Sequence, residues 1–104
     1  MQNVSKISCD NDGGFAMRFR VKWHEGNEKK SSKWSGWYPI NQAKTMDLGK
    51  LNIPKGTEVW AEADARLGKQ KDAWEHVVYE PDTESVATYR VYGSTYYIHV
   101  DLLN

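Results

Sequence analysis

Residues 15–23 read Phe-Ala-Met-Arg-Phe-Arg-Val-Lys-Trp, and this stretch decides the fold of the chain. Large apolar side chains alternate with other residues along it, which is the period of a β-strand with one buried face and one solvent-facing face. A helix of the same sequence would scatter its apolar side chains around its axis. A strand of this kind needs neighbours in its own sheet and a second layer over its apolar face, so the sequence predicts a layered β-protein.

The other face of this predicted strand carries a basic row formed by Arg18, Arg20 and Lys22. A predicted strand at residues 58–65 carries an acidic row that includes Glu62 and Asp64. Because the formal net charge of the chain is zero, we expect the basic row to pair with acidic side chains across a sheet face or to stay solvated.

Several further segments alternate in the same way and are bounded by residues that favour turns. The predicted strands comprise residues 4–9, 15–23, 33–40, 58–65, 73–80, 86–93 and 95–102. Residues 10–14 are rich in Asp, Asn and Gly and predict a hairpin turn between the first two strands, whereas residues 24–33 and 66–72 are expected to be polar loops. Residues 58–65 also contain good helix formers, which leaves a short helix as an alternative there. Seven to eight short strands predict an all-β fold, an antiparallel β-sandwich.

Length and composition limit the classes of function. We expect one domain over residues 1–104, because 104 residues can bury a core without a disulfide or a metal. Cys9 is the single cysteine, which excludes an intrachain disulfide. Basic and acidic side chains number 14 each, so no electrostatic attraction to nucleic acid is expected. The chain has no apolar run of membrane-spanning length, and its first residues lack the apolar core of a signal peptide.

The sequence contains no recognisable catalytic motif, such as a nucleophile elbow or a glycine-rich phosphate loop. Glu62, Asp64 and Glu75 could flank a glycosidic bond, but acidic side chains on an exposed strand face are usually only solvated. We therefore expect a protein that is not an enzyme. Asp10 and Asp12 alternate before a glycine as in a calcium loop, yet the distal bidentate Glu is missing, so a plain turn is favoured over calcium and no other cofactor or metal is expected.

Tryptophan and tyrosine are frequent in this chain, with five Trp and six Tyr against two Phe. If the alternation is right, the core cannot hold all of Trp37, Trp60, Trp74 and Tyr97. Exposed rings with a polar edge provide platforms for the apolar faces of sugars, while neighbouring polar side chains bind the hydroxyl groups. The same rings could instead insert at a lipid–water interface, or fill the core of a small sandwich.

The chain resembles the C-terminal β-sandwich of the cholesterol-dependent cytolysins over residues 13–98, most clearly in residues 13–19, 74–80 and 91–97. In that family the sandwich recognises membranes through a Trp-rich loop and a Thr-Leu pair. Thr95 matches the Thr, but Tyr96 stands at the Leu position, and the segment that matches the Trp-rich loop is charged and keeps one tryptophan, Trp74. The resemblance implies a β-sandwich and, as the alternative function, a membrane-lipid-binding module.

As a whole chain, the sequence also resembles the small slime-mould hemagglutinins, which are one-domain extracellular lectins of about this length. The similar segments are residues 13–23, 34–39 and 93–97. This resemblance implies a secreted, lectin-like jelly roll that binds glycans on cell-surface glycoproteins or glycolipids. Agglutination needs at least two sites, so we expect a homodimer or clustering. In a secreted protein, the sequon at Asn3 could carry a glycan.

These observations together predict a lectin that binds glycans at one end of the sandwich. The candidates for ring stacking are Trp37, Tyr38, Trp74, Tyr96 and Tyr97. The candidates for hydrogen bonding are Asp64, Arg66, Lys69 and Asp72.

Overall fold

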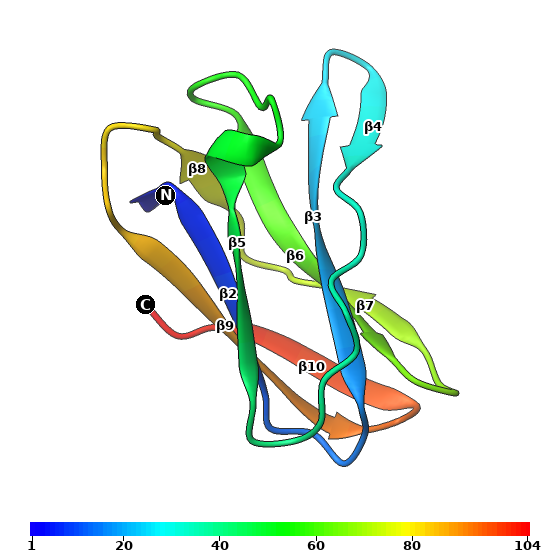
Figure 1. The fold of residues 1–104 in the computed structure, drawn as a ribbon. Helices are drawn as coiled ribbons and strands as arrows, with labels where there is room; N and C mark the ends of the chain where they lie inside the picture. The colour runs from blue at the N-terminus through cyan, green and yellow to red at the C-terminus, as the bar shows by residue number, and fades with distance from the viewer.

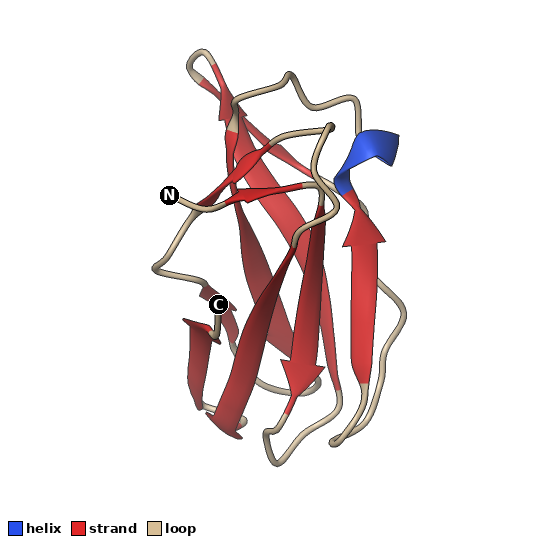
Figure 2. Cartoon of the chain, turned by 90° about the vertical axis from the view of Figure 1, so that its left-hand side faces the viewer, coloured by secondary structure: helices blue, strands red, loops and turns tan.

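Two β-sheets pack face to face in the computed structural model, which describes all 104 residues (Figures 1 and 2). The larger sheet has the order β1-β8-β6-β3-β4, with β7 paired to β6, and the smaller sheet has the order β10-β9-β2-β5. The elements are β1 (Asn3–Val4), β2 (Lys6–Asn11), β3 (Met17–Glu25), β4 (Glu28–Ser31), β5 (Ala43–Asp47), the 3-10 helix η1 (Leu48–Lys50), β6 (Glu58–Ala65), β7 (Gln70–Asp72), β8 (Val77–Tyr79), β9 (Val86–Ser94) and β10 (Tyr97–Leu102). The predicted β-sandwich is confirmed, with ten strands in place of seven to eight. No helix combines the length and the hydrophobicity that a bilayer crossing requires.

Strand β3 has the alternation that its sequence predicts. Its side chains at Met17, Phe19, Val21 and Trp23 are buried between the sheets, and the basic side chains between them lie on the outer face. Antiparallel pairing with β6 places Arg18 opposite Asp64. Strand β6 is a strand and not the alternative helix, and it is buried on both faces from Val59 to its end.

Two pairs of strands run parallel, so both sheets are mixed and not purely antiparallel as predicted. Strand β2 pairs in parallel with β9, and β1 pairs in parallel with β8. The chain passes from one sheet to the other at Ser5, between β1 and β2. The backbone N–H of Ser5 donates to the Ser85 carbonyl at 3.0 Å, and the Ser5 carbonyl accepts from Leu48 at 3.0 Å. This crossing divides the predicted N-terminal strand between the two layers.

The predicted hairpin at residues 10–14 is wrong, because β2 and β3 belong to different sheets. Asn11 is fully buried and fixes the crossover instead. Its side-chain amide donates to the carbonyls of Phe15 at 2.8 Å and Tyr38 at 3.2 Å, and its side-chain oxygen accepts from the Gly13 N–H at 3.0 Å. The turn-forming residues 10–14 therefore reverse the chain between the two sheets and not within one sheet.

The predicted strand at residues 33–40 is also wrong in its form. The segment runs extended along β3, with Ser35 N–H donating to the Phe19 carbonyl at 2.8 Å and Tyr38 forming a single bridge with Met17. Strands β4 and β7 lie in segments predicted to be loops. Every residue of both strands is exposed, so neither has the apolar alternation by which a half-buried strand is recognised. Charged side chains are typical of short exposed strands at a sheet edge.

A single apolar core lies between the two sheets. Its largest fully buried side chains include two tyrosines, Tyr38 and Tyr89, whose hydroxyl groups donate to the carbonyls of Cys9 at 2.9 Å and Glu75 at 2.7 Å. Burial is the main cause that raises the pKa of each of these tyrosines. Small side chains at Ala61 and Ala63 of β6 lie in the same core, which leaves room for large rings.

Candidate functional site

Two tight turns meet at one end of the sandwich, one between β6 and β7 and the other between β9 and β10 (Figure 1). Leu67 adopts a positive φ of 61° in the first turn, and the Lys69 N–H donates to the Thr95 carbonyl of the second turn at 3.0 Å. A Cβ atom at Gly68 would collide with the side chain and the carbonyl of Thr95. The sequence Leu-Gly-Lys therefore lets the two turns lie in contact.

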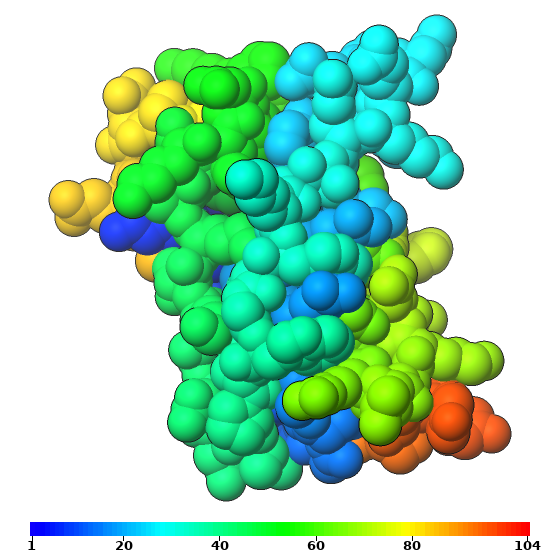
Figure 3. All heavy atoms as spheres, turned by 45° about the vertical axis from the view of Figure 1, so that its right-hand side comes forward, coloured from blue at the N-terminus to red at the C-terminus, as the bar shows by residue number.

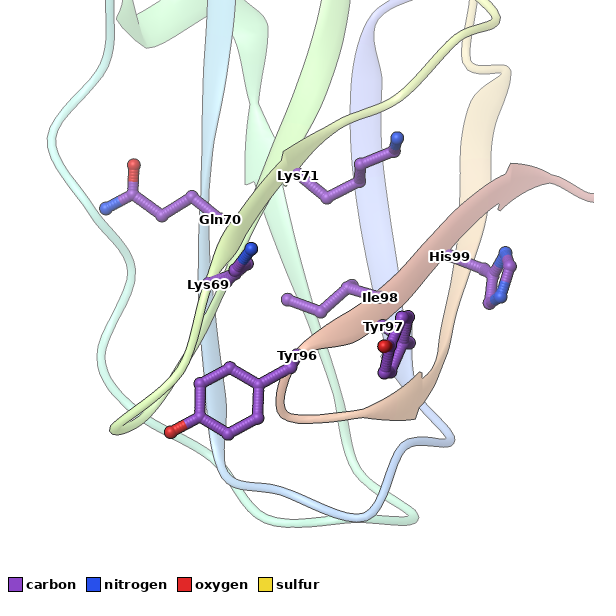
Figure 4. A pocket seen from close by; sticks show the side chains of 7 residues that line it. All are labelled: Lys69, Gln70, Lys71, Tyr96, Tyr97, Ile98 and His99. Atoms are coloured by element: carbon purple, nitrogen blue, oxygen red, sulfur yellow. The ribbon is translucent and has the colours of Figure 1, made fainter.

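A solvent-open pocket of about 400 Å³ lies beside these turns, where β7 of the larger sheet approaches β10 of the smaller sheet. We call it the β7–β10 pocket. Its lining residues are Lys69, Gln70, Lys71, Tyr96, Tyr97, Ile98 and His99 (Figure 4). In the space-filling view, the yellow-green and orange-red segments that form it lie side by side at the lower right (Figure 3).

Apolar, aromatic and cationic groups converge in this pocket. The side chain of Ile98 is 7% exposed, whereas Tyr96 and Tyr97 are 63% and 77% exposed. Figure 4 shows the Ile98 side chain pointing from β10 toward β7, with Lys69 at the start of β7, Tyr96 at the tip and the Tyr97 ring on the other side of β10. A pocket lined by exposed tyrosine rings and two lysine side chains suits a ligand with both an apolar face and polar edges.

Three residues selected from the sequence, Lys69, Tyr96 and Tyr97, lie close together in the structure, because all three line the β7–β10 pocket. Arg66 is exposed in the adjoining turn between β6 and β7. Sequence reasoning did not select Lys71 or His99, although each lies two positions from a selected residue. Once β7 and β10 are known to be strands, the period of two places Lys71 with Lys69 and His99 with Tyr97.

Two predicted binding residues, Tyr38 and Asp64, are buried, so their side chains are not open to a ligand in this structure. Tyr38 is 2% exposed. Its backbone pairs with Met17 at the edge of β3, and its ring lies in the core between the sheets. Asp64 is 7% exposed and accepts a hydrogen bond from the Arg18 Nε at 2.8 Å. Both groups are already engaged within the protein.

Trp37 is half-exposed but belongs to a different surface, the outer face of the larger sheet. There the basic row of β3 pairs with acidic side chains of β6, as predicted, with Arg20 Nε to Glu62 Oε1 at 2.6 Å. The indole of Trp37 covers the Arg18 guanidinium at 4.5 Å, and Trp34 lies over both arginines, 4.2 Å from Arg20. These rings shield ion pairs and stabilise this face.

Asp72 faces the same outer surface and not the β7–β10 pocket. Its carboxylate accepts hydrogen bonds from Lys22 Nζ at 3.0 Å and from the Trp60 Nε1 at 3.1 Å. Burial raises the pKa of Asp72, but these hydrogen bonds outweigh it and hold the pKa below its usual value. Trp74 is 92% exposed in the loop between β7 and β8, outside the pocket.

Trp60 is buried on the outer face of the larger sheet beneath two histidines. The His76 ring stacks on the indole at 4.2 Å, and the His24 ring meets it edge-on at 5.4 Å. Two smaller hollows of about 280 and 240 Å³ flank this group, and each includes a carboxylate, Glu58 in one and Asp72 in the other. With its ring covered, Trp60 provides no open stacking platform.

The calcium hypothesis at Asp10 and Asp12 stays a prediction. Asp12 accepts a hydrogen bond from the Arg90 Nε at 2.9 Å. No group of three or more His, Cys, Asp or Glu side chains is placed to hold a metal ion.

Solved structures share this fold at low sequence identity, although no protein-family profile and no curated protein matches the chain. A disulfide-locked mutant of intermedilysin, solved with human CD59, is 18% identical with a TM-score of 0.50 over 94% of this chain. Listeriolysin O is 17% identical with a TM-score of 0.48, and the membrane-binding domain of pneumolysin is 10% identical with a TM-score of 0.49 over 96% of both chains. The chain spans 23% of the intermedilysin chain and 22% of the listeriolysin O chain. The likeness to intermedilysin supports the β-sandwich fold that the cytolysin resemblance implies.

Proposed function

We propose that this domain is a lectin that binds glycans of cell-surface glycoproteins or glycolipids in the β7–β10 pocket, outside the cell and without catalysis. The observation that carries the proposal is a pocket lined by two exposed tyrosines and two lysines, with Ile98 as its buried apolar residue. Three of the nine residues selected from the sequence line this pocket, and a fourth, Arg66, adjoins it.

Sugar rings have an apolar C–H face and polar edges. The C–H face stacks on a tyrosine ring, and the exposed Tyr97 ring is available because its neighbours in β10 leave it open to solvent. The Lys69 and Lys71 ammonium groups supply hydrogen-bond donors at the border of the pocket, whereas the Gln70 side chain points away from β10 (Figure 4). A single pocket of this kind in each chain predicts that agglutination requires a homodimer or clustered copies.

The test is a glycan array read with the wild-type chain and with Tyr96→Ala and Tyr97→Ala. We expect glycan binding by the wild type and its loss in Tyr97→Ala, with a smaller loss in Tyr96→Ala, which lies further toward the tip. Trp74→Ala is the matched control, because it removes an exposed ring outside the pocket. Loss of binding in Trp74→Ala alone would move the site to the loop between β7 and β8.

A second candidate function is binding to membrane lipid, which one observation favours. Leu67 is 89% exposed in the same tip as Tyr96, so an aliphatic and an aromatic side chain could enter a lipid–water interface together. Flotation with protein-free sterol liposomes separates the two functions. Binding to such liposomes without any hit on the glycan array would refute the lectin proposal and support the lipid function.

A further inference from the structure

Some basic side chains of the sandwich form ion pairs and others do not. On the outer face of the larger sheet, Arg18, Arg20 and Lys22 each contact a carboxylate within 3.0 Å. Arg90 on the smaller sheet pairs with Asp12 at 2.9 Å. Eight basic side chains form no ion pair: Lys6, Lys29, Lys33, Lys44, Lys50 and the three of the tip, Arg66, Lys69 and Lys71. Of these eight, Lys69 and Lys71 line the β7–β10 pocket.

The β7–β10 pocket also contains no carboxylate, which distinguishes it from both hollows beside Trp60. Asp72 is the acidic residue next to Lys71 in the sequence, but the alternation of β7 turns it to the opposite face, where Lys22 and Trp60 bind it. Asp101 of β10 accepts a hydrogen bond from the Tyr92 hydroxyl and does not line the pocket. The ammonium groups of Lys69 and Lys71 therefore lack a partner of opposite charge within the protein.

This distribution of charge selects the chemistry of the ligand. A neutral sugar presents hydroxyl groups that donate as well as accept, and a site for it benefits from strong acceptors such as carboxylates. An ammonium group donates only, and it makes stronger hydrogen bonds to an ionised acceptor than to a neutral one. The net charge of the chain is zero, yet two neighbouring ammonium groups in this pocket have no acidic partner. The pocket therefore favours a ligand that carries an anionic group.

We propose that the glycan bound in the β7–β10 pocket is acidic, with a carboxylate or sulfate group held by Lys69 and Lys71 while its sugar ring stacks on Tyr97. This inference rests on the proposed lectin function and names its ligand class. Arg66 in the adjoining turn adds a third positive charge near the entrance. Because the lysines are exposed, salt screens their attraction, and the affinity for the acidic glycan falls as ionic strength rises.

The test compares matched ligands that differ in the acidic group: sialyllactose against its carboxyl methyl ester, and sulfated against unsulfated lactose. Wild-type protein should bind each acidic ligand about 2- to 30-fold more tightly than its neutral counterpart, as expected for two exposed charge pairs. The double variant Lys69→Gln/Lys71→Gln should lose most of this preference, whereas Lys69→Arg/Lys71→Arg should retain it because both positive charges remain. The control is Lys50→Gln, which removes one exposed, unpaired charge from η1 at the opposite end of the sandwich (Figure 1).

The outcomes separate this inference from the proposed function. Equal binding of acidic and neutral ligands, unchanged in the Gln variants, would overturn the inference and leave the lectin function standing. No binding to any glycan would overturn both. Lysine-dependent binding to phosphatidylserine liposomes that carry no saccharide, equal to the binding of sialyllactose, would show recognition of anionic lipid and also overturn the inference. Urea midpoints within error of the wild type would show that the Gln variants remain folded.

Discussion

Replacement of Asn11 by alanine tests how the crossover between β2 and β3 is held in place. The side chain is fully buried and makes three hydrogen bonds to backbone groups, two as donor and one as acceptor. Alanine removes all three and leaves the Phe15 carbonyl and the Gly13 N–H unpaired, whereas the Tyr38 carbonyl still accepts from the Met17 N–H at 3.0 Å. Gly13 is itself buried, so water cannot readily replace the lost acceptor.

The magnitude follows from the number of backbone groups left unpaired. A buried polar group without a partner costs about 1–3 kcal/mol, and the Phe15 carbonyl is only half-buried, so its share is at the low end. The sum is a loss of about 3 kcal/mol in the free energy of unfolding. For a domain of this size, that loss lowers Tm by roughly 15 °C.

Urea unfolding followed by tryptophan fluorescence measures this loss, with Asn27→Ala in the exposed turn between β3 and β4 as the control. Asn11→Asp is a second informative variant. Its carboxylate can still accept from the Gly13 N–H but faces two carbonyl oxygens, so it should be at least as destabilising as alanine. A loss below about 1 kcal/mol in Asn11→Ala would show that the crossover does not depend on these bonds.

Three further predictions concern buried or paired groups. Burial raises the pKa of the Cys9 thiol, so DTNB should react slowly with the native protein and rapidly in urea. Burial also raises the pKa values of Tyr38 and Tyr89, so the unfolded state releases these protons first and the free energy of unfolding should fall as the pH rises above about 10; Tyr38→Phe should reduce this slope. If agglutination is unchanged by EDTA, calcium has no role at Asp10 and Asp12, whereas its loss would support the calcium hypothesis.

The sequence predicted the strands in which apolar and polar residues alternate, including β6, although the structure buries β6 on both faces. Residues 15–23 and 58–65 gave β3 and β6 because each strand faces the core with apolar side chains. It failed at β4 and β7, which are exposed throughout and are defined by backbone pairing to their neighbours. The crossover at residues 10–14 was mistaken for a hairpin because Asn, Asp and Gly specify a turn but not which sheet the next strand joins.

The candidate site was predictable only in part, for a similar reason. Lys69, Tyr96 and Tyr97 come together because two turns far apart in the sequence are in contact through the Lys69–Thr95 hydrogen bond. That contact depends on tertiary structure, which local alternation does not encode. Asp64 and Tyr38 were assigned to the surface, but both are buried. Arg18 of the basic row pairs with Asp64, and Tyr38 belongs to the extended segment that lies along β3.

An abundance of tryptophan is by itself a poor guide to a binding surface, because rings in this chain serve different purposes. Trp34 and Trp37 lie over arginine guanidinium groups, and His76 covers one face of Trp60, so these faces are occupied by the protein itself. The rings of Tyr96 and Tyr97 are largely exposed and lie beside lysines without ionic partners. A ligand that stacks on an open ring and pairs with a free charge displaces nothing but water, whereas binding over Trp37 would have to disrupt an ion-pair network. The binding energy available to a ligand is therefore greater at the tip than on the outer face of the larger sheet, which is why the proposals place recognition in the β7–β10 pocket.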